Sequence, residues 1–123
     1  MAGLEKQVTI KRGEIWTTDL RPGQGYEIAK IKPALIVSSD SVNLNSPVVI
    51  ILPISSQKPS APGIDKIILT KKQTGLAKNS VILLAHIRSI DKSRLTKKVG
   101  RISNTKLTEV EESLKLTLGL VGV

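Results

Sequence analysis

The sequence of 123 residues contains no cysteine and no phenylalanine, and it has only one tryptophan and one tyrosine. The absence of cysteine excludes disulfide bonds and thiolate metal sites, and it is typical of proteins from a reducing compartment. The scarcity of aromatic rings excludes a base-stacking sheet like that of the RNA recognition motif. Because the single histidine is not accompanied by acidic clusters, a zinc or two-metal hydrolase is not expected either.

Long apolar segments are also missing. The runs at 48–54 and 81–85 are the longest, and both are far too short to cross a bilayer. Residues 1–12 are polar and lack the apolar stretch of a signal peptide. We therefore expect one cytoplasmic domain over residues 1–123, with residues 1–10 flexible and no membrane partner.

Positive charge is abundant and unevenly distributed. The net charge is +9, and residues 63–123 hold 12 of the 19 basic side chains. A basic field attracts phosphate backbones and accelerates their encounter with the protein. The composition therefore favours a nucleic acid or an acidic protein as partner, with a solvated lysine-rich surface as the alternative.

Short strand patterns fill most of the chain. Polar loops are expected at 21–31 and 55–63, a turn or single helical turn at 39–47, and a helical turn after Asp91. The apolar and β-branched runs predict strands at 13–20, 33–38, 48–54, 65–69, 80–85 and 98–102.

The clearest helical pattern is at 103–119. Ser103 has the residue type of an N-cap, Gly119 is a stop signal, and Glu111 and Lys115 are spaced for an i,i+4 ion pair. One face carries the apolar residues Leu107, Val110, Leu114 and Leu118. Several short strands followed by one helix predict a mainly β domain, in which a strongly curved antiparallel sheet or small barrel is closed by the C-terminal helix.

The chemistry available is limited to cations, hydroxyls and a few carboxylates. No phosphate-binding glycine loop and no nucleophile elbow is present. RNA, however, carries its own nucleophile, and a protein that orients the 2′-hydroxyl and stabilises charge on the phosphate can cleave RNA without a metal. Lys32, Ser55 and Glu27 are groups of the right kind, although the sequence alone does not bring them together.

Three blocks of sequence resemble the MazF/PemK toxin family, and the likeness covers about residues 11–120. The first block, 13–40, contains a Gly-acid-apolar-aromatic strand, an Asp-Leu-x-Pro turn, a Gly-x-Glu loop and a basic-Pro strand. The second, 49–57, is similar to the family's next strand, which ends in Pro-Ile-Thr/Ser, and has Pro-Ile-Ser at 53–55. The third, 79–103, contributes Arg88, Asp91 and Arg94.

This resemblance implies an SH3-like curved sheet with a C-terminal helix, in a homodimer. It also implies a metal-independent, cofactor-free endoribonuclease that cuts single-stranded mRNA at a short recognition sequence. The expected products have 2′,3′-cyclic phosphate and 5′-hydroxyl ends. The expected partners are RNA and a cognate antitoxin with an acidic, disordered segment.

Three residues are the catalytic candidates. Lys32 occupies the position of the family's catalytic arginine. It keeps the positive charge but loses the planar guanidinium group that can bind a phosphate with two hydrogen bonds. We interpret Lys32 as a phosphate clamp, a general acid or an attenuating change. Ser55 replaces the family's threonine and keeps the hydroxyl. For Glu27 two roles have equal weight: a catalytic carboxylate, or a side chain that accepts hydrogen bonds from backbone amides of the loop.

The remaining candidates are RNA contacts. Tyr26 is the candidate for base stacking, whereas Trp16 is expected in the core or a dimer interface. His86 is placed on a strand, where it is read as a structural or RNA-contacting side chain rather than a general base. Solvated charge is the alternative for Lys58 and Arg88. The full set of predicted RNA-binding residues is Tyr26, Lys30, Ser56, Gln57, Lys58, His86 and Arg88.

Three other functions stay open. A poison of DNA gyrase like the CcdB toxins would share the fold, but it needs an aromatic residue near the chain end, where this sequence has none. A catalytically inactive member that binds RNA or antitoxin is suggested by Lys32 alone. A general SH3-like RNA-binding module is the last of the three, and it does not account for the three family-like blocks that occur in order along the sequence.

Overall fold

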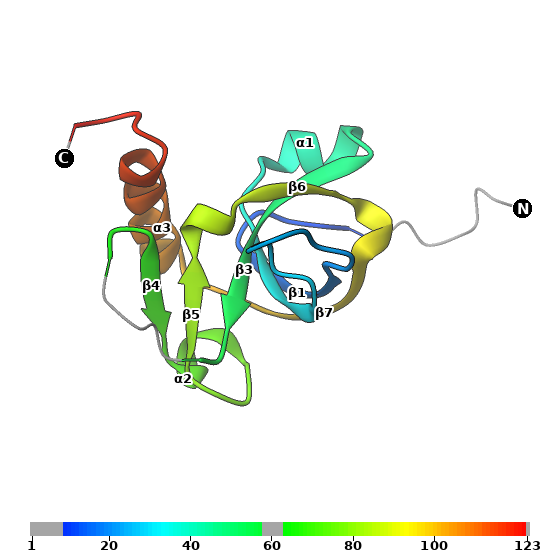
Figure 1. The fold of residues 1–123 in the computed structure, drawn as a ribbon, viewed down its shortest axis with the longest axis horizontal. Helices are drawn as coiled ribbons and strands as arrows, with labels where there is room; N and C mark the ends of the chain where they lie inside the picture. Colours follow the sequence, from blue (N-terminus) through cyan, green and yellow to red (C-terminus); the bar gives the residue numbers. More distant parts are fainter. Residues whose placement is uncertain (1–8, 58–62, 123) are drawn as a thin grey trace, which may run out of the picture.

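The computed structural model describes residues 9–57 and 63–122. Within them, seven strands form one curled antiparallel sheet, and the longest helix lies at the C-terminal end (Figure 1). The strands are β1 (Glu14–Asp19), β2 (Ile31–Ile36), β3 (Val48–Ser55), β4 (Lys66–Leu69), β5 (Ser80–Leu83), β6 (Arg88–Asp91) and β7 (Leu95–Arg101).

Helical segments connect the strands. They are α1 (Asp40–Asn45), α2 (Lys71–Thr74), the 3-10 turns η2 (Leu84–His86) and η3 (Lys92–Arg94), and α3 (Asn104–Thr117). As predicted, Asp91 caps η3 by accepting a hydrogen bond from the amide of Ser93, and Ser103 caps α3 by accepting from Lys106. None of the described helices is long and apolar enough to span a membrane.

Strand β3 organises the sheet, because its two halves have different neighbours. Its first half pairs with β6 and its last residues pair with β5, while β2 runs along its other side. The strand order is β4-β5-β3-β2-β1-β7, with β6 beside β3. The sheet therefore curls without closing, which agrees with the predicted strongly curved sheet and C-terminal helix.

Two apolar clusters cover the two faces of the sheet. Side chains alternate between the faces along a strand, so Ile15 and Trp16 belong to different clusters. One cluster lies between the sheet and α3, which contributes the fully buried Val110. The other lies inside the curl around Trp16, which is 6% exposed, as the predicted core position requires.

Several predicted elements need correction. Strand 80–85 ends at Leu83, because the chain turns into η2, where the amide of Ile87 bonds to the Leu84 carbonyl at 3.1 Å. Strand β7 begins at Leu95 instead of residue 98, and β6 and α2 were not predicted. Residues 1–8, most of the segment predicted to be flexible, lie outside the described residues.

The predicted ion pair within α3 is also wrong. Lys115 pairs with Glu112 at 3.2 Å, and Glu111 instead pairs with Arg12, at 3.0 Å, which joins the helix to the start of β1. Leu118, predicted on the buried face, is 49% exposed because it follows the last helical residue.

Candidate functional site

Lys32 and Ser55 face each other across neighbouring strands. Ala34 of β2 lies opposite Pro53 of β3, and two more steps of this antiparallel register place Lys32 opposite Ser55. Their polar atoms are in contact, since Lys32 Nζ donates to Ser55 Oγ at 3.5 Å. The structure thus brings together two catalytic candidates that are 23 residues apart in the sequence.

Both side chains are shielded from solvent. Ser55 is 7% exposed, and its Oγ also accepts a hydrogen bond from the amide of Gln57 at 3.2 Å. Lys32 is half-buried, and this burial, followed by repulsion from Lys30, lowers the pKa of its ammonium group. Lys32 is therefore a cation that releases its proton more readily than an exposed lysine.

Glu27 and Tyr26 lie in the loop between β1 and β2. The loop contains a turn in which Glu27 Oε1 accepts from the amide of Gln24 at 2.8 Å, and the Glu27 amide donates to the Gln24 carbonyl at 3.0 Å. Gly25, inside this turn, has φ of 61°, a left-handed conformation that favours glycine. Glu27 thus makes the hydrogen bond expected of a residue that holds the loop, while Tyr26 is fully exposed, as a stacking side chain requires.

A hollow of about 410 Å³ gathers seven of the ten predicted site residues. They come from the β1–β2 loop, β2, the end of β3, the residues just after β3, and η2. Leu83, Ile28 and Ala29 add apolar surface that the sequence interpretation did not assign to the site. The seven predicted residues are Tyr26, Glu27, Lys30, Lys32, Ser55, Gln57 and His86.

A second hollow of about 430 Å³ is also lined by Lys30 and Lys32. It includes the predicted RNA contact Ser56 and also Lys78, a basic residue that was missed. Its position just before β5 gave no pattern by which to distinguish Lys78 from any exposed lysine. The two hollows share Lys30 and Lys32, and Ser55 lines only the first of them.

Three predicted residues differ from expectation or lie elsewhere. His86 ends the turn η2 instead of lying on a strand, although it is half-buried and lines the first hollow. Arg88 begins β6 opposite Ile51, outside both hollows, and its Nη1 is buried with no hydrogen-bond partner among the described residues. Lys58 lies outside the described residues.

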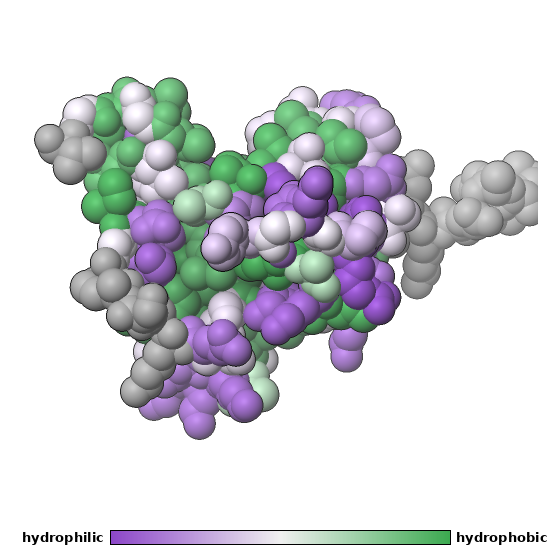
Figure 2. All heavy atoms as spheres, in the orientation of Figure 1, coloured by the Kyte–Doolittle hydropathy of each residue, from purple (hydrophilic) through white to green (hydrophobic). Residues whose placement is uncertain are grey.

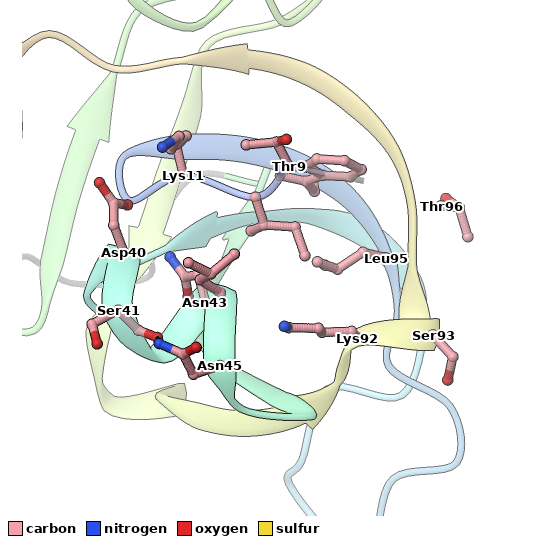
Figure 3. Close-up of a pocket in the computed structure, with 13 residues that line it drawn as sticks. Thr9, Lys11, Asp40, Ser41, Asn43, Asn45, Lys92, Ser93, Leu95 and Thr96 are labelled. Carbon is pink, nitrogen blue, oxygen red and sulfur yellow. The ribbon is translucent and has the colours of Figure 1, made fainter. Parts of the chain in front are cut away.

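A larger hollow of about 880 Å³ lies at the other end of β2 and β3, away from the Lys32–Ser55 pair. It is bounded by α1, η3 and the chain before β1, and Lys92 points into it (Figure 3). None of the predicted site residues lines it. We therefore assign the candidate site to the first two hollows rather than to the most spacious one.

The described residues contain no group of three or more His, Cys, Asp or Glu side chains that could hold a metal ion. The polar groups that line the first hollow are two lysine ammonium groups, the hydroxyls of a serine and a tyrosine, a glutamine amide, an imidazole and the Glu27 carboxylate. Such a set is suited to binding an anion and to moving a proton.

Several solved structures have a similar fold. MazF from Deinococcus radiodurans has a similar structure, with a TM-score of 0.77 and 25% sequence identity over 92% of this chain and 99% of that one. An endoribonuclease from a mycobacterial species superimposes with a TM-score of 0.76 and 18% identity over 97% and 100% of the two chains.

A mycobacterial endoribonuclease in complex with its cognate antitoxin has a TM-score of 0.76 and 19% identity over 93% of this chain and 99% of that one. At this identity the likeness shows the fold. The family itself is shown by the sequence, since the model of the PemK-like, MazF-like toxins matches residues 11–118. The chain therefore belongs to the PemK-like, MazF-like family of toxins of type II toxin–antitoxin systems.

Proposed function

We propose that this toxin is an endoribonuclease that cleaves single-stranded RNA at the Lys32–Ser55 pair, in the cytoplasm, by attack of the RNA's own 2′-hydroxyl. The observation that carries the proposal is the contact between Lys32 Nζ and Ser55 Oγ inside a hollow. In support, structural relatives are named endoribonucleases. The products would have 2′,3′-cyclic phosphate and 5′-hydroxyl ends.

Lys32 and Ser55 would act on the scissile phosphate. The Ser55 oxygen accepts from both Lys32 and the Gln57 amide, so the hydroxyl hydrogen remains to be donated to a non-bridging oxygen. The Lys32 ammonium would neutralise the charge that develops on the phosphate. Its lowered pKa also suits donation of a proton to the departing 5′-oxygen as the P–O5′ bond breaks, while the 2′-hydroxyl would release its proton to solvent water as its oxygen bonds to phosphorus. No metal takes part, because RNA supplies the nucleophile and these side chains supply the charge.

The walls of the hollows would hold the nucleotides beside the cut. Tyr26, fully exposed in its loop, would stack on a base, and Lys30 would contact a phosphate. Ser56 and Gln57 would read polar edges of unpaired bases. We assign His86 to an RNA contact, and we leave Glu27 as the residue that holds the loop in shape.

The antitoxin would compete for this same basic surface. A structural relative forms a complex with its cognate antitoxin, and the net charge of +9 suits an acidic, disordered segment. We also propose a homodimer, because the end of α3 exposes Leu118, Leu120 and Val121. Figure 2 shows hydrophobic surface in this region of the molecule.

The test is cleavage of a long, weakly structured RNA in the presence of EDTA, with the ends of the fragments mapped. The variants are Lys32→Ala, Lys32→Arg and Ser55→Ala, and Lys115→Ala, a solvent-exposed lysine on α3, is the matched control. We expect specific cuts with 5′-hydroxyl ends, lost by at least 100-fold in Lys32→Ala and Ser55→Ala and unchanged in the control.

The arginine variant separates the alternatives. Cuts from Lys32→Arg without cuts from the natural sequence would show an intact scaffold that is attenuated at residue 32. If neither protein cuts RNA, the nuclease proposal is wrong, and assays of RNA, antitoxin and gyrase binding become decisive.

A further inference from the structure

Arg94, the residue before β7, contacts the base of the β1–β2 loop. Its Nη1 donates to the carbonyl oxygens of Asp19 at 3.0 Å and of Arg21 at 2.5 Å, residues more than 70 positions away in the sequence. We infer that Arg94 is a positioning residue, which fixes the loop that carries Tyr26 and Glu27 beside the Lys32–Ser55 pair. The catalytic meaning of this inference rests on the proposed function, whereas the structural claim does not.

The path of β7 explains how Arg94 reaches the loop. The pairing of β1 with β7 shifts between Thr17 and Thr18, so that Thr96 is an extra residue on β7 and Thr18 lies opposite Leu95. Thr96 Oγ1 holds this irregularity by donating to the Thr17 carbonyl at 3.1 Å. A bulge bends its strand and changes the direction of nearby side chains. Here it brings Arg94, two residues before Thr96, to the end of β1.

The other contacts at the loop base lie within the loop or its flanks. The amide of Leu20 donates to the Lys30 carbonyl at 3.0 Å, and the Leu20 side chain is fully buried. Asp19 binds the side chain of Arg21 through both carboxylate oxygens, at 2.9 and 3.0 Å. The two hydrogen bonds from Arg94 differ from these local contacts, because they connect the base of the loop to η3, a separate element of the fold.

The guanidinium group suits this task. It is always protonated, so its hydrogen bonds to carbonyl oxygens are charge-assisted and do not depend on pH in the working range. Arg94 does not line the hollow that contains Lys32 and Ser55. Its effect on cleavage is therefore indirect, through the position of the loop.

The test measures loop order directly, by backbone ¹⁵N relaxation on the full chain. In the natural protein we expect order parameters near 0.85 at residues 19–21 and 30. Arg94→Ala should lower the order parameters of these same residues below about 0.6 without changing β2 and β3. Arg94→Lys, which retains a charged donor, should give intermediate values. Arg101→Ala, which removes an exposed arginine of β7, is the matched control.

Cleavage kinetics are the second measurement. For Arg94→Ala we expect kcat/KM to fall about 10- to 100-fold, with partial recovery in Arg94→Lys. If Arg94→Ala does not fold, Arg94→Lys decides the question by its relaxation data. Loop order equal to that of Arg101→Ala in both variants would overturn the inference. Absence of cleavage in both the natural protein and Lys32→Arg would refute the proposed function but leave the relaxation test valid.

Discussion

The acid of the Gly-acid-apolar-aromatic motif, Glu14, provides a sharp test of how this fold is stabilised. Its carboxylate is buried, with the residue only 4% exposed, and it binds three donors. The Lys11 amide and the Trp16 indole donate to Oε1 at 2.8 and 3.1 Å, and Lys98 pairs with Oε2 at 2.7 Å. The perturbation is Glu14→Gln, which keeps the shape but removes the charge.

The expected loss in free energy of unfolding is about 2–3 kcal/mol. Hydrogen bonds to a charged group contribute about 1.5–3 kcal/mol, and one oxygen of the acid becomes an amide donor that faces Lys98. The indole and the Lys11 amide can still bind the remaining oxygen, which keeps the loss below that of Glu14→Ala. The pair of Glu109 with Lys106, at 2.8 Å within α3, has a half-exposed carboxylate and should contribute only about 0–1 kcal/mol.

The prediction also has a pH dependence. Burial raises the pKa of Glu14, but the hydrogen bonds from Lys98, Lys11 and Trp16 together outweigh it and lower the pKa below 4.5. A lowered folded-state pKa stabilises the protein above the unfolded-state pKa, and this contribution disappears as the pH falls through the folded-state pKa. The difference between natural protein and Glu14→Gln should therefore shrink on acidification.

The assay is urea unfolding at fixed protein concentration, followed by the fluorescence of Trp16, the only tryptophan. Glu109→Gln is the matched control, and the series is repeated from pH 7 to pH 3. A loss in Glu14→Gln no larger than that in Glu109→Gln at pH 7 would refute the reasoning. So would a difference between natural protein and Glu14→Gln that is independent of pH.

Three further predictions concern single positions. Ser103→Ala should lower the free energy of unfolding by about 1 kcal/mol, because the hydroxyl caps α3 at the Lys106 amide; a change below 0.2 kcal/mol in urea unfolding would contradict this. Gly100→Ala should destabilise by at least about 1–3 kcal/mol, because the new methyl group collides with the Thr74 carbonyl, whereas Gly122→Ala, which meets nothing within 4 Å, should be neutral. Hydrogen bonds from Arg21 lower the pKa of Asp19 to about 2, so its NMR titration midpoint should lie near pH 2 and rise toward 3.8 in Arg21→Ala.

The sequence was most informative where the local pattern and the tertiary role agree. The C-terminal helix was predictable because its cap, its apolar face and its glycine stop are all local signals, and α3 runs from Asn104 to Thr117. Strands with buried runs, such as β3, were predictable for the same reason. In contrast, β6 has the sequence RSID, in which a single buried residue, Ile90, gives no alternation to detect.

The candidate site required information that the sequence does not contain. Lys32 and Ser55 are neighbours because of the register between β2 and β3, and a shift by one residue would turn one of them to the opposite face. Only the resemblance to a family linked them in advance. His86 was misplaced because the apolar run before it continues past the strand into η2, where a hydrogen bond between Ile87 and Leu84 ends the extended chain.

The distribution of charge suggests two separate roles for the cations. Residues 63–123 carry most of the basic side chains, yet the cations that line the first hollow are Lys30 and Lys32, from the first half of the chain. Lys97 lies exposed on β7, a strand that lines neither hollow. We therefore expect the lysines of β7 to attract RNA at long range and the lysines of β2 and its preceding loop to contact phosphate.

Salt dependence distinguishes these roles. Each phosphate contact with single-stranded RNA contributes about 0.7 to the slope of log affinity against log salt concentration. In a Ser55→Ala background, which permits binding without cleavage, Lys30→Ala should reduce the slope by about 0.7. Lys97→Ala should leave the slope unchanged and slow association at low salt. Equal reductions in slope for both variants would show that β7 contacts RNA, and the binding surface would then extend well beyond the two hollows.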